Sequence, residues 1–421
     1  MNKNLIFPVL LLGAIADAGA AVIDSPSGRV RVTTHVTATG APRYSVSIDG
    51  QEVVLDSPLG LVTDFADLST GLTEGEFNTR HDQRSYSQDR IKRRDIKVDA
   101  TRATIKYSSP DGRQLLTEWH VADDGVALRY RVPRQKGRGA MRVLEERTGF
   151  RFPDSTGGFL TSQCAPMTGW KRSKPSYEEY YVMDAPLDSA SQYGHGYTFP
   201  ALFRLPGDRW ALVSETGVDG YYCASRLSDY SPEGYIIAYP MEGENNGNGT
   251  AAPGLALPGV TPWRLIALGN GLAPIVETTL PWDVVEPLYT IDTPARTGKG
   301  TWSWILWQDA SINYEDQLKY IDLAAEMGYD NVLVDAWWDR KIGEEKMLDL
   351  FEYARSKGVK PILWFSSSGY WNDVEQSPVN RMERPIARKK WMRWMQANGV
   401  DAIKVDFFGG DKQETMRLYE D

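Results

Sequence analysis

Hydrophobic and polar residues alternate through residues 25–290 in a pattern that predicts β-strands. Runs such as RVRVTTHVT and RYSVSID carry apolar residues at every second position, and turn signals separate them. The segment VADDGVALRY places Asp-Gly between two such runs, which indicates a tight hairpin. Because long amphipathic helical patterns do not occur here, the pattern predicts an antiparallel β-sandwich.

One stretch of this region, residues 241–259, breaks the alternation. Its sequence MEGENNGNGTAAPGLALPG is rich in Gly, Asn and Pro, which favour turns over regular elements. We expect a long surface loop here, of the kind that is mobile or lines a substrate cleft.

The pattern changes after residue 300, where apolar runs alternate with amphipathic helical stretches. The apolar runs are TWSWILW, NVLVDAWW, PILWFSS and AIKVDFF. Asn313 is the predicted N-cap of the first helix, and a glycine ends each of the three helices between the runs, at Gly328, Gly358 and Gly399. This alternation predicts a parallel β-sheet covered by helices.

The number of strands sets the expected architecture. A complete (β/α)8 TIM barrel needs on the order of 250 residues, whereas only residues 301–421 follow the change of pattern, and a new helical pattern runs from Gln413 to the last residue. We expect the first half of a barrel, incomplete at its C-terminus; a small open sheet is the alternative. Half a barrel exposes an unpaired strand edge, so we expect the 421-residue form to be inactive and poorly soluble.

The expected domain boundaries follow from these patterns. We expect a signal peptide at 1–20, a β-sandwich domain at 22–285, a linker at 286–300 and a partial catalytic barrel at 301–421.

The N-terminus has the pattern of an export signal: a lysine, an apolar run from Leu5 to Ile15, and then small residues up to Ala21. We expect cleavage near Ala20 and a periplasmic or secreted protein; an uncleaved membrane anchor is the alternative. Nothing later in the chain reaches the roughly 18 apolar residues that a membrane-spanning helix needs.

Composition narrows the class of partner. The chain is 42% hydrophobic and carries a formal net charge of -9, which argues against a polyanionic partner such as nucleic acid. Its many aromatic residues suit stacking on the apolar faces of sugar rings. Cys164 and Cys223 are the two cysteines, and either one disulfide or two buried thiols fits their number, whereas their spacing does not fit a zinc site.

Candidate chemistry gathers where the predicted parallel strands end, because function collects at the carboxyl ends of such strands. Lys404 and Asp406 are two residues apart, so their side chains share one face of a strand, and a lysine beside a carboxylate favours the ionised form that a nucleophile requires. The alternative for Asp406, and for Asp335, is a structural role as a helix cap or in a salt bridge. The residues expected at these strand ends are Asp335, Asp406, Lys404, Trp304, Trp307, Trp337, Trp338 and Trp364.

The residues that other catalytic mechanisms require do not occur at the expected strand ends. The four histidines all precede residue 200, which disfavours a Ser-His-Asp site at the strand ends, and neither a GxSxG elbow nor a Walker or GxGxxG phosphate loop occurs. Carboxylates remain, and paired carboxylates are the usual catalytic groups of glycoside hydrolysis.

The order of these motifs resembles glycoside hydrolase family 97. An export signal, a β-sandwich, TPWR at 261–264, TWSWILW, VDAWWD and IKVDFFGGDKQ occur in the family's order, and the resemblance covers essentially the whole mature chain. It implies a sandwich like that of galactose mutarotases, a (β/α)8 barrel, a small C-terminal β domain, activity on α-glucosides or α-galactosides, and Ca²⁺ in the active site.

The resemblance also implies roles for particular residues. Lys404-Val405-Asp406 matches the Lys-x-Asp setting of the nucleophile in the retaining branch, whereas the inverting α-glucosidases lack this aspartate. Glu178 in SYEEYY matches a calcium-binding glutamate of the sandwich domain, with Glu179 as the alternative. The family's acid/base glutamate and its other calcium ligands fall beyond Asp421.

We therefore expect an exo-acting, retaining α-galactosidase-like enzyme with an oligosaccharide substrate. Asp406 is the expected nucleophile, and Asp335, Trp337, Trp338, Trp304, Trp364 and Lys404 are the expected substrate-binding residues. An α-glucosidase is the alternative within the family. A non-catalytic glycan-binding protein is the alternative from another class.

Overall fold

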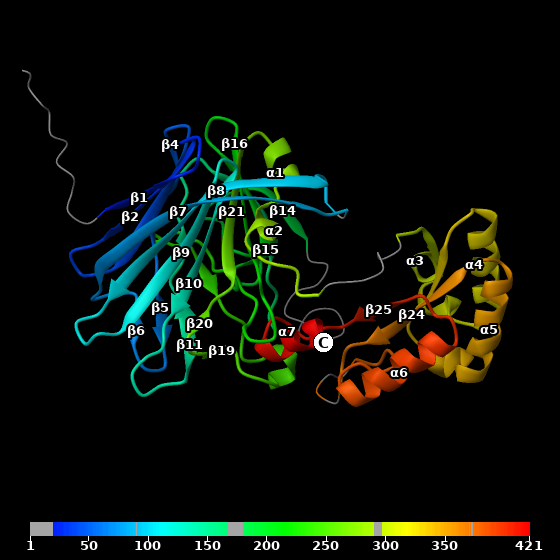
Figure 1. The fold of residues 1–421 in the computed structure, drawn as a ribbon. Helices are drawn as coiled ribbons and strands as arrows, with labels where there is room; N and C mark the ends of the chain where they lie inside the picture. Colours follow the sequence, from blue (N-terminus) through cyan, green and yellow to red (C-terminus); the bar gives the residue numbers. More distant parts are fainter. Residues whose placement is uncertain (1–19, 90, 167–179, 290–296, 370, 372–373) are drawn as a thin grey trace, which may run out of the picture.

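The computed structural model describes residues 20–89, 91–166, 180–289, 297–369, 371 and 374–421. Within these ranges an all-β body is followed by a smaller unit of parallel strands and helices (Figure 1). The predicted signal peptide lies outside the described residues, as do both candidate calcium ligands, Glu178 and Glu179.

Every strand pairing of the all-β body is antiparallel, as the alternation predicts. β9 and β10 pair up to Ala122 and Gly125, so the Asp-Gly signal does form the predicted tight hairpin. The strands are β1 (Ala21–Asp24), β2 (Val30–Val36), β3 (Pro42–Ile48), β4 (Gln51–Pro58), β5 (Leu61–Thr63), β6 (Asp67–Leu68), β7 (Thr73–Ser87), β8 (Asp95–Ser108), β9 (Gln114–Ala122), β10 (Gly125–Val132), β11 (Ala140–Glu146), β12 (Gly149–Phe150), β13 (Gly157–Ser162), β14 (Tyr181–Pro186), β15 (Tyr197–Leu205), β16 (Arg209–Thr216), β17 (Arg226–Leu227), β18 (Tyr235–Ala238), β19 (Gly254–Ala256), β20 (Gly259–Val260) and β21 (Trp263–Asn270).

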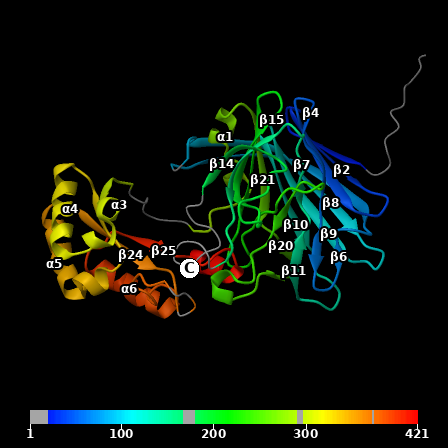
Figure 2. The same cartoon turned by 180° about the vertical axis from the view of Figure 1, so that it is seen from behind.

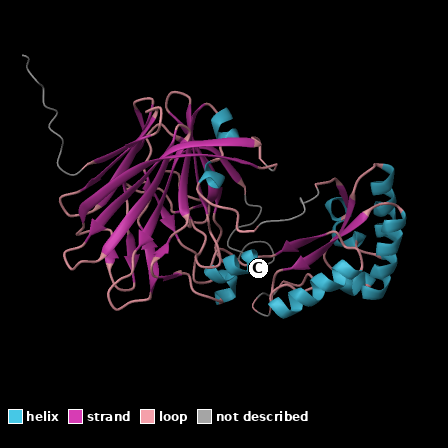
Figure 3. Ribbon diagram, in the orientation of Figure 1, coloured by secondary structure: helices cyan, strands magenta, loops and turns pink. Residues whose placement is uncertain are grey.

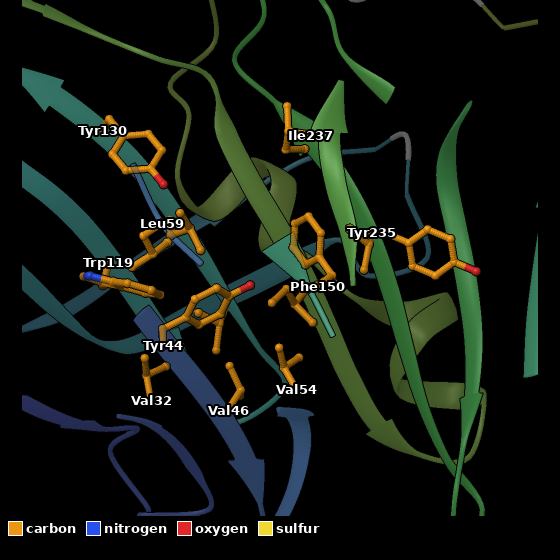
Figure 4. Close-up of a cluster of buried hydrophobic side chains, with 14 of the residues drawn as sticks. Val32, Tyr44, Val46, Val54, Leu59, Trp119, Tyr130, Phe150, Tyr235 and Ile237 are labelled. Carbon is orange, nitrogen blue, oxygen red and sulfur yellow. The ribbon is translucent and has the colours of Figure 1, made fainter. Parts of the chain in front are cut away.

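These strands form a sandwich-like arrangement around one core. A large sheet runs from β12 to β7, and two four-stranded sheets, β1–β4 and β19-β11-β5-β6, accompany it. The inward positions of β3 alternate with outward ones, and its Tyr44 packs beside Trp119 of β9 in the core (Figure 4). The period of two in the sequence therefore selects which face of each strand is buried.

The segment 241–259 is more ordered than the surface loop that we expect. It contains the short helix η2 (Glu244–Gly247) as well as β19 and β20, and the side chains of Glu244 and Asn245 are buried. The difference arises because this segment packs on a partner distant in sequence: Asn245 N–H donates to the carbonyl of Gly409 at 2.7 Å. Composition alone carries no information about such a partner.

The second unit contains the parallel sheet, in the order β22-β23-β24-β25. Helices α4 and α5 lie on the side of this unit that faces away from the sandwich, and α6 runs below β24 and β25 (Figures 1 and 2). After the two short helices α1 (Ala273–Glu277) and α2 (Leu280–Asp283), the elements are β22 (Gly300–Trp302), α3 (Trp304–Trp307), η3 (Gln308–Ser311), α4 (Tyr314–Glu326), β23 (Asn331–Val334), the π-helical turn η4 (Trp338–Ile342), α5 (Glu344–Ser356), β24 (Lys360–Ser366), α6 (Pro385–Ala397), β25 (Ala402–Asp406) and α7 (Gln413–Glu420).

The helix boundaries follow the predicted signals. The side chain of Asn313 accepts a hydrogen bond from Asp316 N–H at 2.9 Å, which satisfies an otherwise unpaired donor at the start of α4. Gly328, Gly358 and Gly399 all have positive φ, between +65° and +75°, and end their helices in the left-handed conformation that glycine adopts without strain.

One predicted strand is wrong in its second half. The run TWSWILW forms a strand only up to Trp302, and Trp304 to Trp307 form one helical turn instead. Short apolar runs do not distinguish strand from buried helix. Here Ser303 has no exposed surface, and its hydroxyl accepts hydrogen bonds from Ser311 at 2.8 Å and Gln317 at 3.0 Å, so side-chain contacts turn the chain at this residue.

The last segment of the chain returns to the sandwich, beside which Figure 3 places the short helix α7. Glu420 accepts a hydrogen bond from Gly220 N–H at 2.8 Å, and Gln413 accepts one from Gly254 N–H at 3.0 Å. The residues that follow β25 are thereby held between the two units.

The structure bears on three further expectations from the sequence. The four parallel strands form an open sheet within the described residues, so the half-barrel and the domain boundaries stay predictions. Cys164 and Cys223 are both buried and share no disulfide, which agrees with the two-thiol alternative. In the part of the chain that the structure describes, no helix combines the length and apolarity needed to cross a membrane.

Candidate active site

The carboxyl ends of three strands of the four-stranded parallel sheet bring the candidate residues together. Asp406 is the last residue of β25, Asp335 directly follows β23, and Trp302 ends β22. Parallel strands in one sheet end at a common edge, so residues 33 and 71 positions apart from Asp335 in sequence become neighbours through the strand order alone.

Lys404 connects the two aspartates. Its Nζ lies 3.1 Å from Asp335 Oδ2 and 3.6 Å from Asp406 Oδ2. The same ammonium lies 4.2 Å from the centroid of the Trp302 ring, a cation–π contact that adds to the attraction. One cation thus sits between two carboxylates and an aromatic face.

Asp335 is the more enclosed of the two carboxylates. Its side chain is 5% exposed, and Oδ2 accepts a hydrogen bond from Trp302 Nε1 at 2.7 Å while Oδ1 accepts one from Ala336 N–H at 2.7 Å. Burial raises the pKa of Asp335 above its ordinary value, although Lys404 and the hydrogen bonds oppose this rise. The salt bridge with Lys404 is the structural role that the sequence left open for this residue.

Both carboxylate oxygens of Asp406 accept hydrogen bonds. Oδ1 accepts one from Phe407 N–H at 2.8 Å, and Oδ2 accepts one from Trp364 Nε1 at 3.2 Å. The side chain is 17% exposed, so it keeps an opening toward solvent that Asp335 lacks. Asp406 therefore combines a defined orientation with access.

Two strand-end residues adopt a backbone conformation that is rare for side-chain-bearing residues. Phe407, directly after Asp406, has φ +62°, and Trp337, two residues after Asp335, has φ +75°. Such conformations cost on the order of 1–3 kcal/mol each and persist where surrounding contacts hold them, most often at functional sites. They occur here at the ends of the two strands that carry the aspartates.

The predicted tryptophans separate into two groups. Trp304 and Trp337 both donate from Nε1 to the carboxylate of Asp309, at 3.0 and 3.1 Å, and Trp307 is 45% exposed. Trp338 has no exposed surface and stacks on Trp394 in the helix-facing core. Its ring presents no face to the aspartates, because the turn η4 directs the side chain into the core beneath the sheet.

Sequence reasoning missed Trp302, which stacks on Trp304 with the ring centroids 5.6 Å apart. With TWSWILW interpreted as one continuous strand, Trp302 falls in mid-strand and Trp304 nearer its end. Asp309 was missed as well, because no strand or motif marks it. A strand boundary at Trp302 would have identified the first, but only the fold identifies the second.

A pocket of about 500 Å³ opens beside Asp406, between the sandwich and the parallel sheet. Residues of both units line it: Gln163, Thr198, Phe199, Glu215, Ala224 and Ser225 from the sandwich, and Val405, Asp406, Phe407, Phe408, Gly410, Asp411 and Tyr419 from the second unit. Its size suits a small-molecule ligand such as a sugar unit. The pocket exists because the chain after β25 returns to the sandwich.

Asp411 lines the same pocket as Asp406, and Glu244 of the sandwich contacts Asp411 from behind this wall; the sequence assigned no role to either. Burial raises the pKa of Asp411 to about 8, and the nearby carboxylates of Glu244 and Glu215 add to this rise. The pKa of Glu244 is also raised, chiefly by burial, while its Oε2 accepts a hydrogen bond from Asp411 N–H at 2.8 Å. Asp411 therefore retains a proton over a range in which an exposed aspartate is ionised.

The described residues do not by themselves form the predicted calcium site. No group of three or more His, Cys, Asp or Glu side chains among them is arranged to hold a metal ion. The two glutamates singled out for calcium are outside the described ranges.

A pocket beside strand-end carboxylates of a parallel sheet is the arrangement of an α/β enzyme, and carboxylates are the catalytic groups of glycosidases. Residues 23–287 match the family model described as Glycosyl-hydrolase 97 N-terminal, and residues 296–421 match the model Glycoside hydrolase 97. The chain belongs to glycoside hydrolase family 97.

Two curated relatives are similar to the chain over most of its length. A probable retaining alpha-galactosidase of Streptomyces bingchenggensis is 28% identical over 418 residues, which are 96% of this chain and 59% of that protein. A retaining alpha-galactosidase of Bacteroides thetaiotaomicron is 22% identical, over 93% of this chain and 60% of that protein. The chain thus spans about three fifths of the length of these relatives.

One of the similar solved structures is named for a different glycosidase activity. The crystal structure of a beta-arabinopyranosidase is 54% identical, with a TM-score of 0.92, over 95% of this chain and 64% of that one. A glycoside hydrolase family 97 enzyme from a Pseudoalteromonas strain, in complex with panose, is 20% identical with a TM-score of 0.78, over 95% of this chain and 63% of that one. The latter likeness shows the fold alone.

Proposed function

We propose that this chain carries the nucleophile of an exo-acting, retaining glycosidase that cleaves terminal α-galactosides. The observation that carries the proposal is the setting of Asp406, which is anchored through both oxygens, lies 3.6 Å from the Lys404 ammonium and lines the pocket between the two units. A nucleophilic carboxylate must be oriented and accessible, and Asp406 meets both conditions.

In the proposed reaction a carboxylate oxygen of Asp406 attacks the anomeric carbon while the bond to the leaving oxygen breaks. A general acid protonates the leaving oxygen, and the glycosyl ester formed with Asp406 is then hydrolysed by water. From the resemblance to the family we expect that acid/base glutamate after the fourth strand, beyond Asp421. Lys404 and Trp364 would hold the carboxylate in its attacking position.

The substrate has a second candidate, a terminal β-arabinopyranoside, which is favoured by the 54% identity to a beta-arabinopyranosidase. The two candidates share their chemistry: β-L-arabinopyranose has the ring configuration of α-D-galactopyranose without the C5 hydroxymethyl group. One nucleophile position therefore serves both, and the pocket around C5 decides the preference. The α-glucoside alternative inverts the configuration at C4.

The test uses the protein expressed from its complete reading frame. We expect Asp406→Asn to abolish turnover of p-nitrophenyl α-galactoside and β-arabinopyranoside, because the amide is a poor nucleophile. The matched control is Asp401→Asn at the opposite end of the same strand, where Asp401 pairs with the partly exposed Lys360 at 3.1 Å, and it should retain activity.

Two readouts can contradict the proposal. Unchanged activity of Asp406→Asn would remove Asp406 as the nucleophile, and a first product of inverted anomeric configuration by NMR would remove the retaining mechanism. Comparison of aryl α-galactoside, β-arabinopyranoside and α-glucoside ranks the substrates. Binding of galactosides without turnover of any of them would support a glycan-binding protein instead.

Calcium and export remain parts of this proposal that rest on sequence alone. We propose that Glu178, or Glu179, contributes to a calcium site, which predicts loss of activity in a chelator and recovery with added Ca²⁺. We also propose a periplasmic or secreted protein, which N-terminal sequencing of the mature form would test through cleavage near Ala20.

A further inference from the structure

Trp364 lies directly under the proposed nucleophile and is too buried to serve as a sugar platform. It is 1% exposed, and its Nε1 donates to Asp406 Oδ2 at 3.2 Å. An indole N–H can donate a hydrogen bond but cannot accept one. It therefore stabilises an ionised carboxylate oxygen, but not a protonated carboxyl group whose O–H points toward the indole.

The indole of Trp364 is fixed by contacts on several sides. In the parallel sheet Trp364 pairs with Lys404, and the Trp364 carbonyl accepts a hydrogen bond from Trp338 Nε1 at 2.8 Å. The ring meets Phe407 edge to face at 5.7 Å and packs in one buried cluster with Ala336 and Val374. The donor is therefore presented to Asp406 in one orientation.

The second carboxylate oxygen of Asp406 accepts a hydrogen bond from the backbone. Phe407 N–H donates to Oδ1 at 2.8 Å, and it does so from a left-handed backbone conformation, φ +62°. Since the Phe407 ring also packs against Trp364, the two donors belong to one packed unit. A change in the Trp364 ring would disturb both.

We propose that Trp364 is a positioning residue that orients the carboxylate of Asp406, with Trp338 bracing it from the core. The inference rests on the proposed role of Asp406 as nucleophile. It replaces the sequence-based expectation that Trp338 and Trp364 form a stacking platform for substrate. Trp364 acts through Asp406 and does not touch the sugar.

The test is Trp364→Phe in the protein expressed from its complete reading frame, a change that removes the N–H and keeps most of the apolar contact. We expect kcat to fall about 10- to 100-fold, the range for a hydrogen bond to a charged group, with KM changed less than about threefold. The acidic midpoint of the kcat/KM profile should move to higher pH, because a donor that favoured the carboxylate form is gone.

The pH midpoint separates positioning from simple loss of folded protein. The midpoint does not depend on how much enzyme is active, so partial unfolding lowers the amplitude without shifting it. The matched control is Trp210→Phe, a half-buried tryptophan of the sandwich that packs against Phe159 with the ring centroids 5.6 Å apart. It should leave the midpoint and kcat unchanged.

A second measurement does not depend on the Trp364→Phe variant. In protein with ¹⁵N-labelled indoles, the Trp364 Nε1–H resonance should shift between the unaltered protein and Asp406→Asn, because its acceptor changes from a carboxylate to an amide. No shift of any indole resonance would overturn the inference. If Asp406→Asn is inactive while Trp364→Phe keeps the pH midpoint and kcat, the positioning role alone fails; an active Asp406→Asn removes the proposed function itself.

Discussion

Two clusters in this protein each join one basic side chain to two carboxylates, and they differ in how far solvent reaches them. In the sandwich, Arg264 pairs with both oxygens of Glu146 at 2.9 and 2.7 Å and also with Glu215, and the side chains of Arg264 and Glu146 are 1% and 0% exposed. At the strand ends, Lys404 pairs with Asp335 and Asp406 and is 31% exposed. The Arg264–Glu146 pair is sealed, and Glu215 of the same cluster reaches the wall of the pocket, whereas Asp406 of the second cluster opens on that pocket.

The difference shows what distinguishes a structural cluster from a reactive one. A planar guanidinium satisfies two carboxylate oxygens at once, which leaves Glu146 with no oxygen for a ligand. The ammonium of Lys404 is a single point charge that compensates two aspartates incompletely. Asp406 thus keeps an accessible carboxylate, as a nucleophile requires.

Removal of Arg264 should have the largest effect on stability. Arg264→Met leaves the Glu146 carboxylate buried without its counterion, which typically costs about 3–5 kcal/mol. Urea unfolding followed by fluorescence measures the loss. The control is Arg204→Met, which breaks an exposed pair with Asp184, both partners being more than 40% exposed, and should cost no more than about 1 kcal/mol. Equal losses would contradict the contrast between sealed and open clusters.

Removal of Lys404 should affect activity more than stability. Lys404→Met takes away the cation between Asp335 and Asp406, and loss of one preorganised electrostatic contact lowers kcat about 100-fold. Because Lys404 is partly exposed and Asp335 keeps its hydrogen bonds from Trp302 and Ala336, the free energy of unfolding should fall by less than in Arg264→Met. Lys360→Met, at the opposite end of the sheet, should change neither quantity. A large loss of stability with unchanged kcat would make this cluster structural as well.

A third expected effect concerns the dependence of stability on pH through Asp411, which lines the same pocket. In the folded protein Asp411 has a pKa raised to about 8, so below that pH the folded state binds a proton that the unfolded chain releases near its ordinary value of 3.8. Stability should therefore fall as pH rises from about 4 to about 8. In Asp411→Asn this part of the decline should disappear, as measured by melting temperature across pH. An unaltered decline would assign it to other groups.

Much of the second unit could be predicted from local sequence. Asn313 and the glycines 328, 358 and 399 have short-range effects on the backbone, so the ends of α4, α5 and α6 were predictable. The exception is the run 301–307, where hydrogen bonds to Ser303 from residues 8 and 14 positions away turn the chain. Such contacts leave no periodic signal.

The candidate site was predictable only in part. Asp406 and Lys404 follow from strand position and motif, but the roles of Trp302, Asp309 and Trp364 depend on where each ring points. Trp337, Trp338 and Trp364 are all tryptophans near strand ends. Only their packing distinguishes the buried Trp338 and Trp364 from Trp337, whose ring lies nearer the surface.

By itself the sequence determined the alternation of strands, the helix ends and the carboxylates that fall at the carboxyl edge of the sheet, because these depend on local periodicity and residue conformation. Tertiary structure alone decided the pocket, the anchoring of Asp406 by Trp364, and the pairing of segment 241–249 with residues 409–412. The hydrogen bonds among these features join residues that are 42 to 170 positions apart. Such contacts form only after the chain has folded, so no local pattern encodes them.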